Sequence, residues 1–162
     1  LIVCIGAPAA AFVQRNRPNV FANIPMVFTA VDERRVQFTA LTPNDVAVPV
    51  RIEYLKAIQN ILRVLPQTKN VVVVVGGSPL EKFWKEEIGR EVKPLADRLA
   101  FSWTDTLSFE QLLQHAAALP PNSVIFWELM IVDAAGVVHE GNAAIRQLHD
   151  ATNAPIFRRP KG

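Results

Sequence analysis

The sequence contains one cysteine, Cys4, so an internal disulfide and a cysteine-rich zinc site are both excluded. Cys4 lies inside the apolar run at residues 1–5, which indicates a small buried core residue. The chain also lacks any run of about 18 or more apolar residues, so no part of it is expected to span a membrane. It does not begin with methionine, and we expect it to be a piece of a longer or processed protein.

An excess of charge of one sign is missing as well. The 17 Lys and Arg residues nearly balance the 15 Asp and Glu residues, which leaves a net charge of +2. Basic residues gather only in short groups, at 34–35 and 158–161. Nucleic-acid binding needs a clustered basic face, so we predict no nucleic-acid partner. With 162 residues, half of them hydrophobic, the chain can form a sizeable core.

The sequence patterns of several enzyme classes are absent. The Gly-Gly-Ser loop at 76–78 lacks both the Gly-Lys-Ser/Thr of a phosphate loop and the third glycine of the dinucleotide fingerprint. No Gly-x-Ser-x-Gly elbow occurs. His139 and Glu140 have no third ligand at metal spacing, and the adjacent acids at 32–33 and 86–87 diverge. We predict no catalytic residues, metal or cofactor, and keep a Rossmann-like nucleotide-dependent enzyme as the alternative.

The clearest positive signal is a strand, a loop and a helix in residues 70–95. Five consecutive valines at 71–75 are typical of a central parallel strand that helices cover on both faces. Ser78 is a good N-cap, Pro79 suits the first helical position, and Glu81 completes a capping box. Such units place ligands at the carboxyl ends of their strands.

Strand and helix patterns alternate along the rest of the chain, which predicts a parallel sheet with right-handed crossovers. Pro18 predicts that the first helix ends by Arg17, and Pro49 argues against a central strand at 46–50. We interpret residues 34–50 as a crossing between two lobes. The predicted fold is a flavodoxin-like parallel α/β sandwich, most complete from 51 to 157. The strands are expected at 1–5, 24–31, 71–75, 98–103, 123–127 and 154–157, and residues 46–50 are expected to be extended within the crossing.

Loop tips at the strand ends could line a ligand cleft. Small residues at two helix N-termini are expected to leave backbone N–H groups for an anion such as a carboxylate. Trp127 offers a stacking face and Glu128 an acceptor. A core role is the simpler explanation of Trp127, and a plain strand end explains Glu128 as well as ligand binding does. A two-component receiver domain is excluded because residues 6–8 stand where its acids should be. The predicted ligand-binding residues are Ala7, Asp32, Ser78, Trp127 and Glu128.

Several stretches resemble one family. Residues 2–10 (IVCIGAPAA), the segment PMVF at 25–28 followed by Asp32, and a valine-rich strand after Pro66 resemble the ABC-transporter substrate-binding protein family of the type I periplasmic-binding fold. The stretch FWELMIVDAAG at 126–136 is similar to members that occur as extracytoplasmic sensor regions of bacterial histidine kinases. The resemblance extends to about residue 157.

This resemblance implies two α/β lobes that close over a small solute, such as an amino acid or a small carboxylate, without catalysis. Residues 1–48 would be the end part of the first lobe and the crossing segment, so the first lobe is only partly present. Residues 49–157 would be the second lobe and 158–162 a tail. The implied location is periplasmic or otherwise extracytoplasmic, with an ABC permease or the protein's own kinase domain as partner.

The resemblance also places the predicted site residues. Ala7 falls on the family's first-lobe loop and Asp32 on the acid after the next strand. Ser78 falls on the second-lobe loop and Glu128 on the last cleft strand. These roles are implied by the resemblance, whereas the position of each residue after a strand is read from the sequence itself.

Overall fold

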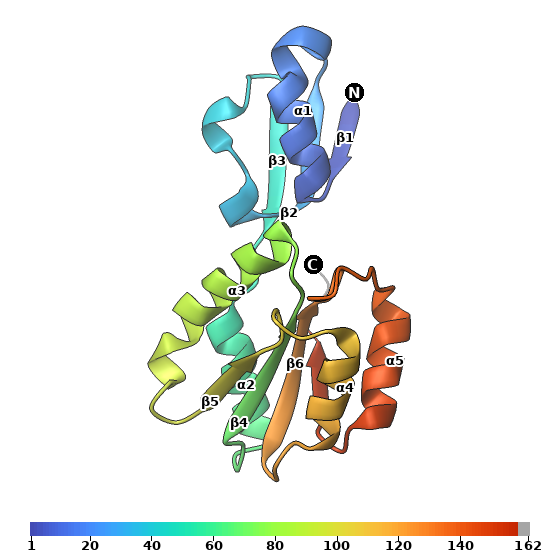
Figure 1. Cartoon of the computed structure of the whole chain (residues 1–162). Helices are drawn as coiled ribbons and strands as arrows, with labels where there is room; N and C mark the ends of the chain where they lie inside the picture. The colour runs from blue at the N-terminus through green and yellow to red at the C-terminus, as the bar shows by residue number, and fades with distance from the viewer. Residues whose placement is uncertain (159–162) are drawn as a thin grey trace. The chain divides into compact units, whose positions relative to one another are not determined.

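The computed structural model describes residues 1–158, which form two compact units (Figure 1). Unit 1 comprises Leu1–Ile52, and unit 2 begins at Glu53. The segment that was interpreted as a crossing contributes a strand to unit 1, because its residues 45–50 pair with the preceding strand. Of the predicted tail, only Arg158 lies within the described residues.

Unit 1 is a three-stranded parallel sheet with one long helix. The strands β1, β2 and β3 lie in the order β1-β2-β3, and both pairings are parallel. Cys4, Met26 and Phe28 face Ala10 and Val13 of the helix and form a small core. The elements are β1 (Ile2–Ile5), α1 (Ala7–Val20), β2 (Met26–Asp32), the short 3-10 helices η1 (Glu33–Arg35) and η2 (Phe38–Ala40), and β3 (Asp45–Val50).

The prediction that the first helix ends by Arg17 is wrong, because α1 continues to Val20 with Pro18 inside it. Pro18 lies in the last turn, where the helix loses one backbone hydrogen bond and then ends within two residues. The amide of Phe21 still donates to the Arg17 carbonyl, which closes the helix. The Arg17 side chain forms an ion pair with Asp45, with Nη1 of Arg17 2.8 Å from Oδ1 of Asp45.

Unit 2 is a four-stranded parallel sheet, in the order β5-β4-β6-β7, with helices on both faces. This arrangement confirms the predicted parallel α/β fold, including the parallel pairing of the strands that contain Val71 and Val124. The elements are α2 (Tyr54–Val64), β4 (Asn70–Val75), α3 (Pro79–Val92), η3 (Lys93–Leu95), β5 (Ala100–Trp103), α4 (Phe109–Ala117), β6 (Ser123–Leu129), α5 (Gly141–Ala151) and β7 (Ile156–Arg158).

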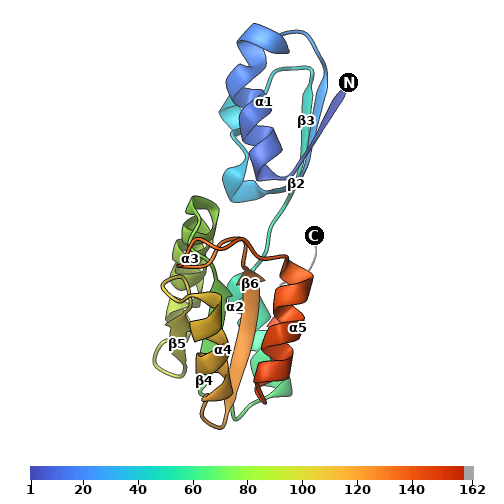
Figure 2. The ribbon, with the colours of Figure 1, turned by 45° about the vertical axis from the view of Figure 1, so that its right-hand side comes forward.

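The valine run explains why β4 is central. Successive strand residues point to opposite faces, and both faces of β4 are buried. Val72 and Val74 pack with α4 and α5, which form one layer (Figure 2). On the other face, Tyr54 of α2 contacts the rings of Trp84 in α3 and Phe126 in β6, with ring centroids 6.1 and 6.3 Å apart.

The predicted capping box at Ser78 is present, and a second capping box begins α4. The Ser78 hydroxyl accepts from the Glu81 amide, and the Ser108 hydroxyl accepts from the Gln111 amide. In turn, the Glu81 side chain accepts from the Ser78 amide and the Gln111 side chain accepts from the Ser108 amide. These paired bonds fix the residues at which α3 and α4 begin. No helix within residues 1–158 is long and apolar enough to cross a membrane.

Candidate functional site

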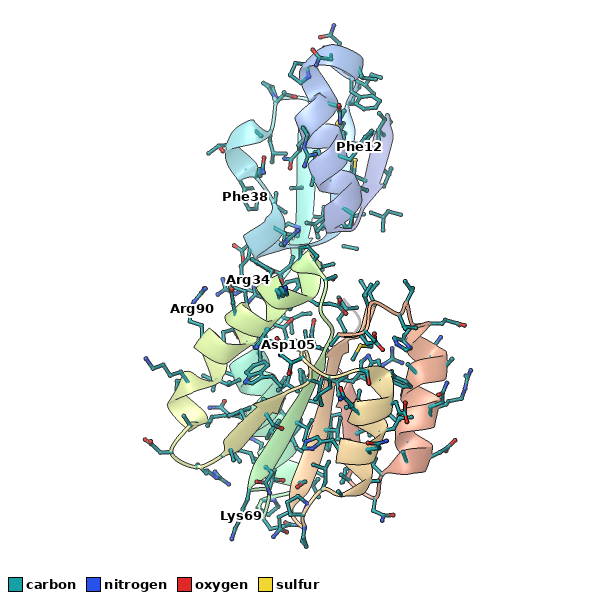
Figure 3. The ribbon with its side chains drawn as sticks, viewed as in Figure 1. Phe12, Arg34, Phe38, Lys69, Arg90 and Asp105 are labelled. Atoms are coloured by element: carbon teal, nitrogen blue, oxygen red, sulfur yellow. The ribbon has the colours of Figure 1, made fainter. Side chains whose placement is uncertain are left out.

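A hollow of about 500 Å³ lies at the carboxyl edge of the unit 2 sheet. It is formed where the loops after β4, β5 and β6 meet, which is the edge where parallel α/β sheets bind ligands. Asp105 marks this edge in Figure 3, and Lys69 marks the opposite one. The lining residues are Gly77, Ser78, Pro79, Lys82, Asp105, Val132, Asp133, Ala134 and Gly136.

The hollow presents groups of both charges. Lys82 is exposed on the first turn of α3 and makes no ion pair with any residue between 1 and 158. The Asp105 carboxylate accepts a bond from Lys85 through Oδ2 at 2.8 Å. The Ser78 hydroxyl accepts from the Glu81 amide, so its hydrogen can still donate. The lining can therefore meet a carboxylate, a hydroxyl or an ammonium group.

The amides of the Gly-Gly-Ser loop do not form an anion cradle, contrary to the expectation from the sequence. The Gly76 amide donates to the Leu129 carbonyl at 3.0 Å, and the Gly77 amide to the Val132 carbonyl at 2.8 Å. The Ser78 amide donates to Oε2 of Glu81 at 2.9 Å. The fold uses all three donors to hold the loops together, so an anion here would have to be met by side chains.

Glu81 joins two of the loops that form the hollow. Its side chain is fully buried, with Oε2 on the Ser78 amide and Oε1 on the Ile131 amide. The backbones approach so closely that a Cβ at Gly76 would collide with Oε1 of Glu81 and with the Val132 carbonyl oxygen. Glycine is therefore required at 76 by lack of space.

Asp133 holds the loop after β6. Its carboxylate accepts from the amides of Phe109, Ala135 and Val137 at 2.9 Å each and from the His139 ring at 3.0 Å. Burial alone would raise the pKa of this carboxyl, but these hydrogen bonds outweigh it and lower the pKa from 3.8 to about 2. Asp133 thus shapes the wall of the hollow, and both of its oxygens are already engaged.

The predicted site residues of unit 2 lie in different surroundings. Ser78 lines the hollow. Trp127 is buried in the core beside Val74 and Leu112, which accounts for the indole without a ligand. Glu128 is in β6 with 2% of its surface exposed, so a ligand would have to reach below the surface of the sheet edge to contact it.

In unit 1, Ala7 follows β1 and Asp32 is the last residue of β2, both at the carboxyl edge of their own sheet. Gly6 precedes Ala7 with φ of 82°, a left-handed conformation that glycine adopts without strain and that turns β1 into α1. Asp32 forms two bonds to the Arg34 guanidinium, each 2.8 Å long. Burial would raise the pKa of Asp32, but the hydrogen bonds and positive charge of Arg34 lower it. The same carboxylate accepts from the Arg34 amide and so caps η1.

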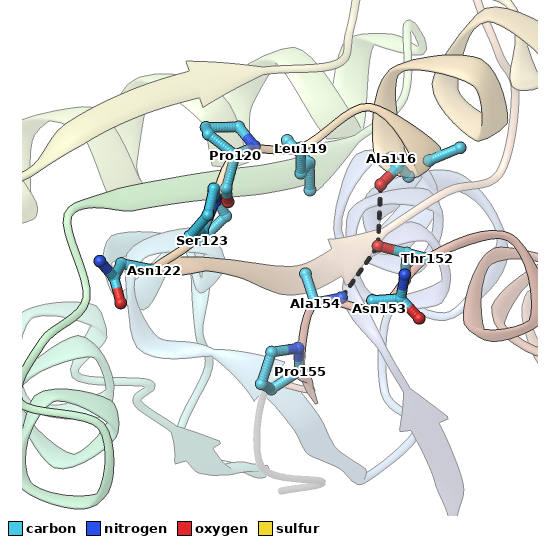
Figure 4. Close-up of a pocket in the computed structure, with 11 residues that line it drawn as sticks. Ala116, Leu119, Pro120, Asn122, Ser123, Thr152, Asn153, Ala154 and Pro155 are labelled. Carbon is cyan, nitrogen blue, oxygen red and sulfur yellow. Dashed lines mark hydrogen bonds between the residues drawn. The ribbon is translucent and has the colours of Figure 1, made fainter.

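A second, smaller hollow of about 280 Å³ lies at the amino edge of the unit 2 sheet (Figure 4). Its hydroxyl groups are bonded within the protein. The Thr152 hydroxyl donates to the Ala116 carbonyl at 2.8 Å and accepts from the Ala154 amide at 3.1 Å. The Ser123 hydroxyl donates to the Pro120 carbonyl at 2.6 Å. The hollow at the carboxyl edge is therefore the better candidate site.

Sequence reasoning did not select Lys82 or Asp133. Lys82 belongs to no recognisable motif. The sequence hint is its position four residues after the N-cap Ser78, because residues four apart lie on the same face of a helix. The excursion to Asp133 was predicted as one of the loop tips that could line a cleft and as the start of a turn, which the structure confirms at residues 133–136, but Asp133 was not selected as a site residue. Within residues 1–158, no three His, Cys, Asp or Glu side chains gather as metal ligands would.

Comparison with known proteins supports the fold. No protein-family pattern and no curated protein sequence matches the chain. A solved structure, the ABC domain in complex with L-Trp from Streptococcus pneumoniae, is similar with a TM-score of 0.62 and 13% sequence identity. The similarity covers 98% of this chain and 54% of that one, so the chain spans about half the length of its structural neighbour. The two proteins therefore share this parallel α/β fold, which is consistent with a flavodoxin-like periplasmic-binding type.

Proposed function

We propose that this chain is a non-catalytic domain that binds a small solute, and that the hollow at the carboxyl edge of unit 2 contacts it. The observation that carries the proposal is the set of groups around that hollow: the Lys82 ammonium, the Ser78 hydroxyl and the Asp105 carboxylate. Together these complement a small molecule with a carboxylate and an amino group, such as an amino acid. The neighbour of similar fold is a complex with L-Trp, which supports this ligand class.

Two biological roles fit this proposal. The domain would serve as the ligand sensor of a two-component signalling protein with its own kinase domain, or as the substrate-binding component of an ABC importer. The sequence stretch at 126–136 favours the sensor. Both roles place the domain in the periplasm or elsewhere outside the cytoplasm. The gene sequence after Gly162 distinguishes them, since a membrane helix and a kinase core would follow in a sensor.

A thermal-shift screen of the purified chain tests the proposal. We expect stabilisation by an L-amino acid or a small carboxylate, because a ligand that binds only the folded state raises its stability. Lys82→Gln should weaken that binding about tenfold, the effect of losing one charge-assisted hydrogen bond. The matched control is Lys93→Gln, which removes the same charge from an exposed lysine at the far end of α3.

Nucleotides form the other arm of the screen, because the sequence leaves a nucleotide-dependent enzyme as the alternative. The engaged amides of residues 76–78 disfavour phosphate binding at that loop. Stabilisation by a nucleotide and by no amino acid or carboxylate would contradict the solute-binding proposal. Equal affinity in the Lys82 and Lys93 variants would instead contradict the placement of the site.

A further inference from the structure

A small space beside Gly77 in the carboxyl-edge hollow is flanked by two backbone carbonyl oxygens. A Cβ at Gly77 would lie 3.6 Å from the carbonyl oxygens of Asp105 and Asp133, which is ordinary van der Waals contact. All three residues line the hollow. Gly77 is only half-buried, so solvent reaches this space. The glycine therefore leaves room for a group the size of a methyl between the loops that follow β5 and β6.

Gly77 differs in this respect from its neighbour. A Cβ at Gly76 would collide with the Glu81 carboxylate and the Val132 carbonyl oxygen, so the fold itself requires glycine there. Neither a left-handed backbone nor crowding by residues 1–158 requires glycine at 77. A ligand group that occupies the space is a reason for glycine that remains.

The oxygens around this space are suited to a hydrogen-bond donor. No residue between 1 and 158 donates a hydrogen bond to the Asp105 carbonyl. The Asp133 carbonyl accepts from the Gly136 amide at 3.0 Å, which leaves it a second lone pair. Both aspartates also carry carboxylates, although Lys85 offsets the charge of Asp105. A positively charged N–H group fits these acceptors, because hydrogen bonds with an ionised donor are the stronger kind.

We propose that the space beside Gly77 binds the ammonium group of the solute, which donates to the carbonyl oxygens of Asp105 and Asp133. The Lys82 ammonium, on the first turn of α3, then meets the carboxylate of the same molecule. The solute is therefore an amino acid with a free ammonium group, and a small carboxylate without one does not bind. The inference rests on the proposed function and narrows its two ligand classes to one.

Pairs of compounds that differ only in the ammonium group test this requirement. The pairs are alanine with propionate, leucine with isocaproate, aspartate with succinate, and tryptophan with indolepropionate. In calorimetric titrations of the chain, the amino acid that binds best should bind at least about tenfold more tightly than its partner, because a charge-assisted hydrogen bond is lost. Equal affinity within that pair would overturn the inference and leave the proposed function standing. No binding by any of these compounds would overturn both.

Gly77→Ala supplies an independent measurement. The added methyl group fills the space without a clash, so the melting temperature should stay within about 2 °C of that of the unsubstituted chain. Affinity for the best amino acid should nevertheless fall at least about tenfold. Gly141→Ala is the matched control and should bind normally, because Gly141 is outside the lining and its Cβ would meet no atom within 4 Å. Undiminished affinity in Gly77→Ala would overturn the inference.

An inorganic cation is the other source of positive charge for these oxygens. Ca²⁺ takes about six to eight oxygen ligands, and the Lys82 ammonium in the same lining disfavours it. Millimolar calcium chloride without an amino acid should therefore leave the melting temperature unchanged. Stabilisation by calcium that Gly77→Ala abolishes would overturn the inference in favour of a metal ion.

Discussion

At the scale of single residues, the side chains that shape the hollow of unit 2 bond to the protein itself, and a different set of side chains faces the space that a ligand would occupy. Glu81 and Asp133 are buried, and each bonds backbone amides from two segments of the chain. Their role is to fix the loops after β4 and β6. Lys82, Ser78 and Asp105 stand on the walls of the hollow and are the groups that a solute would meet.

Asp133 predicts a dependence of stability on pH. Its folded-state pKa of about 2 lies below the ordinary 3.8, so its contribution is present above pH 4 and is lost as pH falls towards 2. Asp133→Asn should therefore cost on the order of 1 kcal/mol of unfolding free energy at pH 7, with a smaller difference near pH 2.5. Urea unfolding at several pH values measures it.

The control is Asp150→Asn, because Asp150 is exposed and, among residues 1–158, its carboxylate pairs only with the exposed His149. That variant should follow the unsubstituted protein at every pH. A constant difference between Asp133→Asn and the unsubstituted protein from pH 7 to 2.5 would contradict the assigned role of Asp133.

Gly76 and Gly77 predict a contrast between neighbouring positions. Gly76→Ala should destabilise unit 2 by about 1–3 kcal/mol, because its Cβ would collide with the Val132 carbonyl and the Glu81 carboxylate. Gly77→Ala should change stability by less than about 0.5 kcal/mol, since the nearest atoms would lie 3.6 Å away. Chemical denaturation compares the two, and equal losses would show that the close approach at Gly76 is not the constraint.

At the scale of elements, the two capping boxes form a matched pair. Ser78→Ala and Ser108→Ala should each cost about 1 kcal/mol, because each removes the side-chain acceptor at a helix N-terminus. Only Ser78 lines the hollow, so only its substitution should also weaken ligand binding, by roughly three- to tenfold. Thermal melts and titration calorimetry separate the two effects. Equal binding by both variants would remove Ser78 from the site.

The elements also show how far the sequence could be interpreted. The valine run, the capping residues and the apolar periodicity predicted β4, α3 and α4 well, because these signals are local and agree with burial on both faces of the sheet. Pro18 misled the prediction of the end of α1, since proline is tolerated where only one helical bond is lost. The expectation of free amides at 76–78 was wrong, because the acceptors of the Gly76 and Gly77 amides lie more than fifty residues away along the chain and the Ser78 amide donates to Glu81 of its own capping box.

At the scale of the whole molecule, each unit has its own sheet and core, and the chain spans about half of its structural neighbour. Residue types at strand ends were enough to find Ser78. They could not show that Trp127 would pack in the core or that Lys82 would stand on the wall of the hollow, because both depend on which loops meet in space. The contributions of Ala7, Asp32 and Glu128 to ligand binding stay predictions.

The central claim is that a small solute binds at the carboxyl edge of unit 2. Titration of the isotope-labelled chain with the best ligand of the screen, followed by amide NMR shifts, tests it most directly. We predict that saturable shifts are concentrated at Gly77, Ser78, Lys82 and Ala134. Shifts confined to the amino-edge hollow around Thr152 and Asn153, or none at millimolar amino acids and carboxylates, would contradict the account.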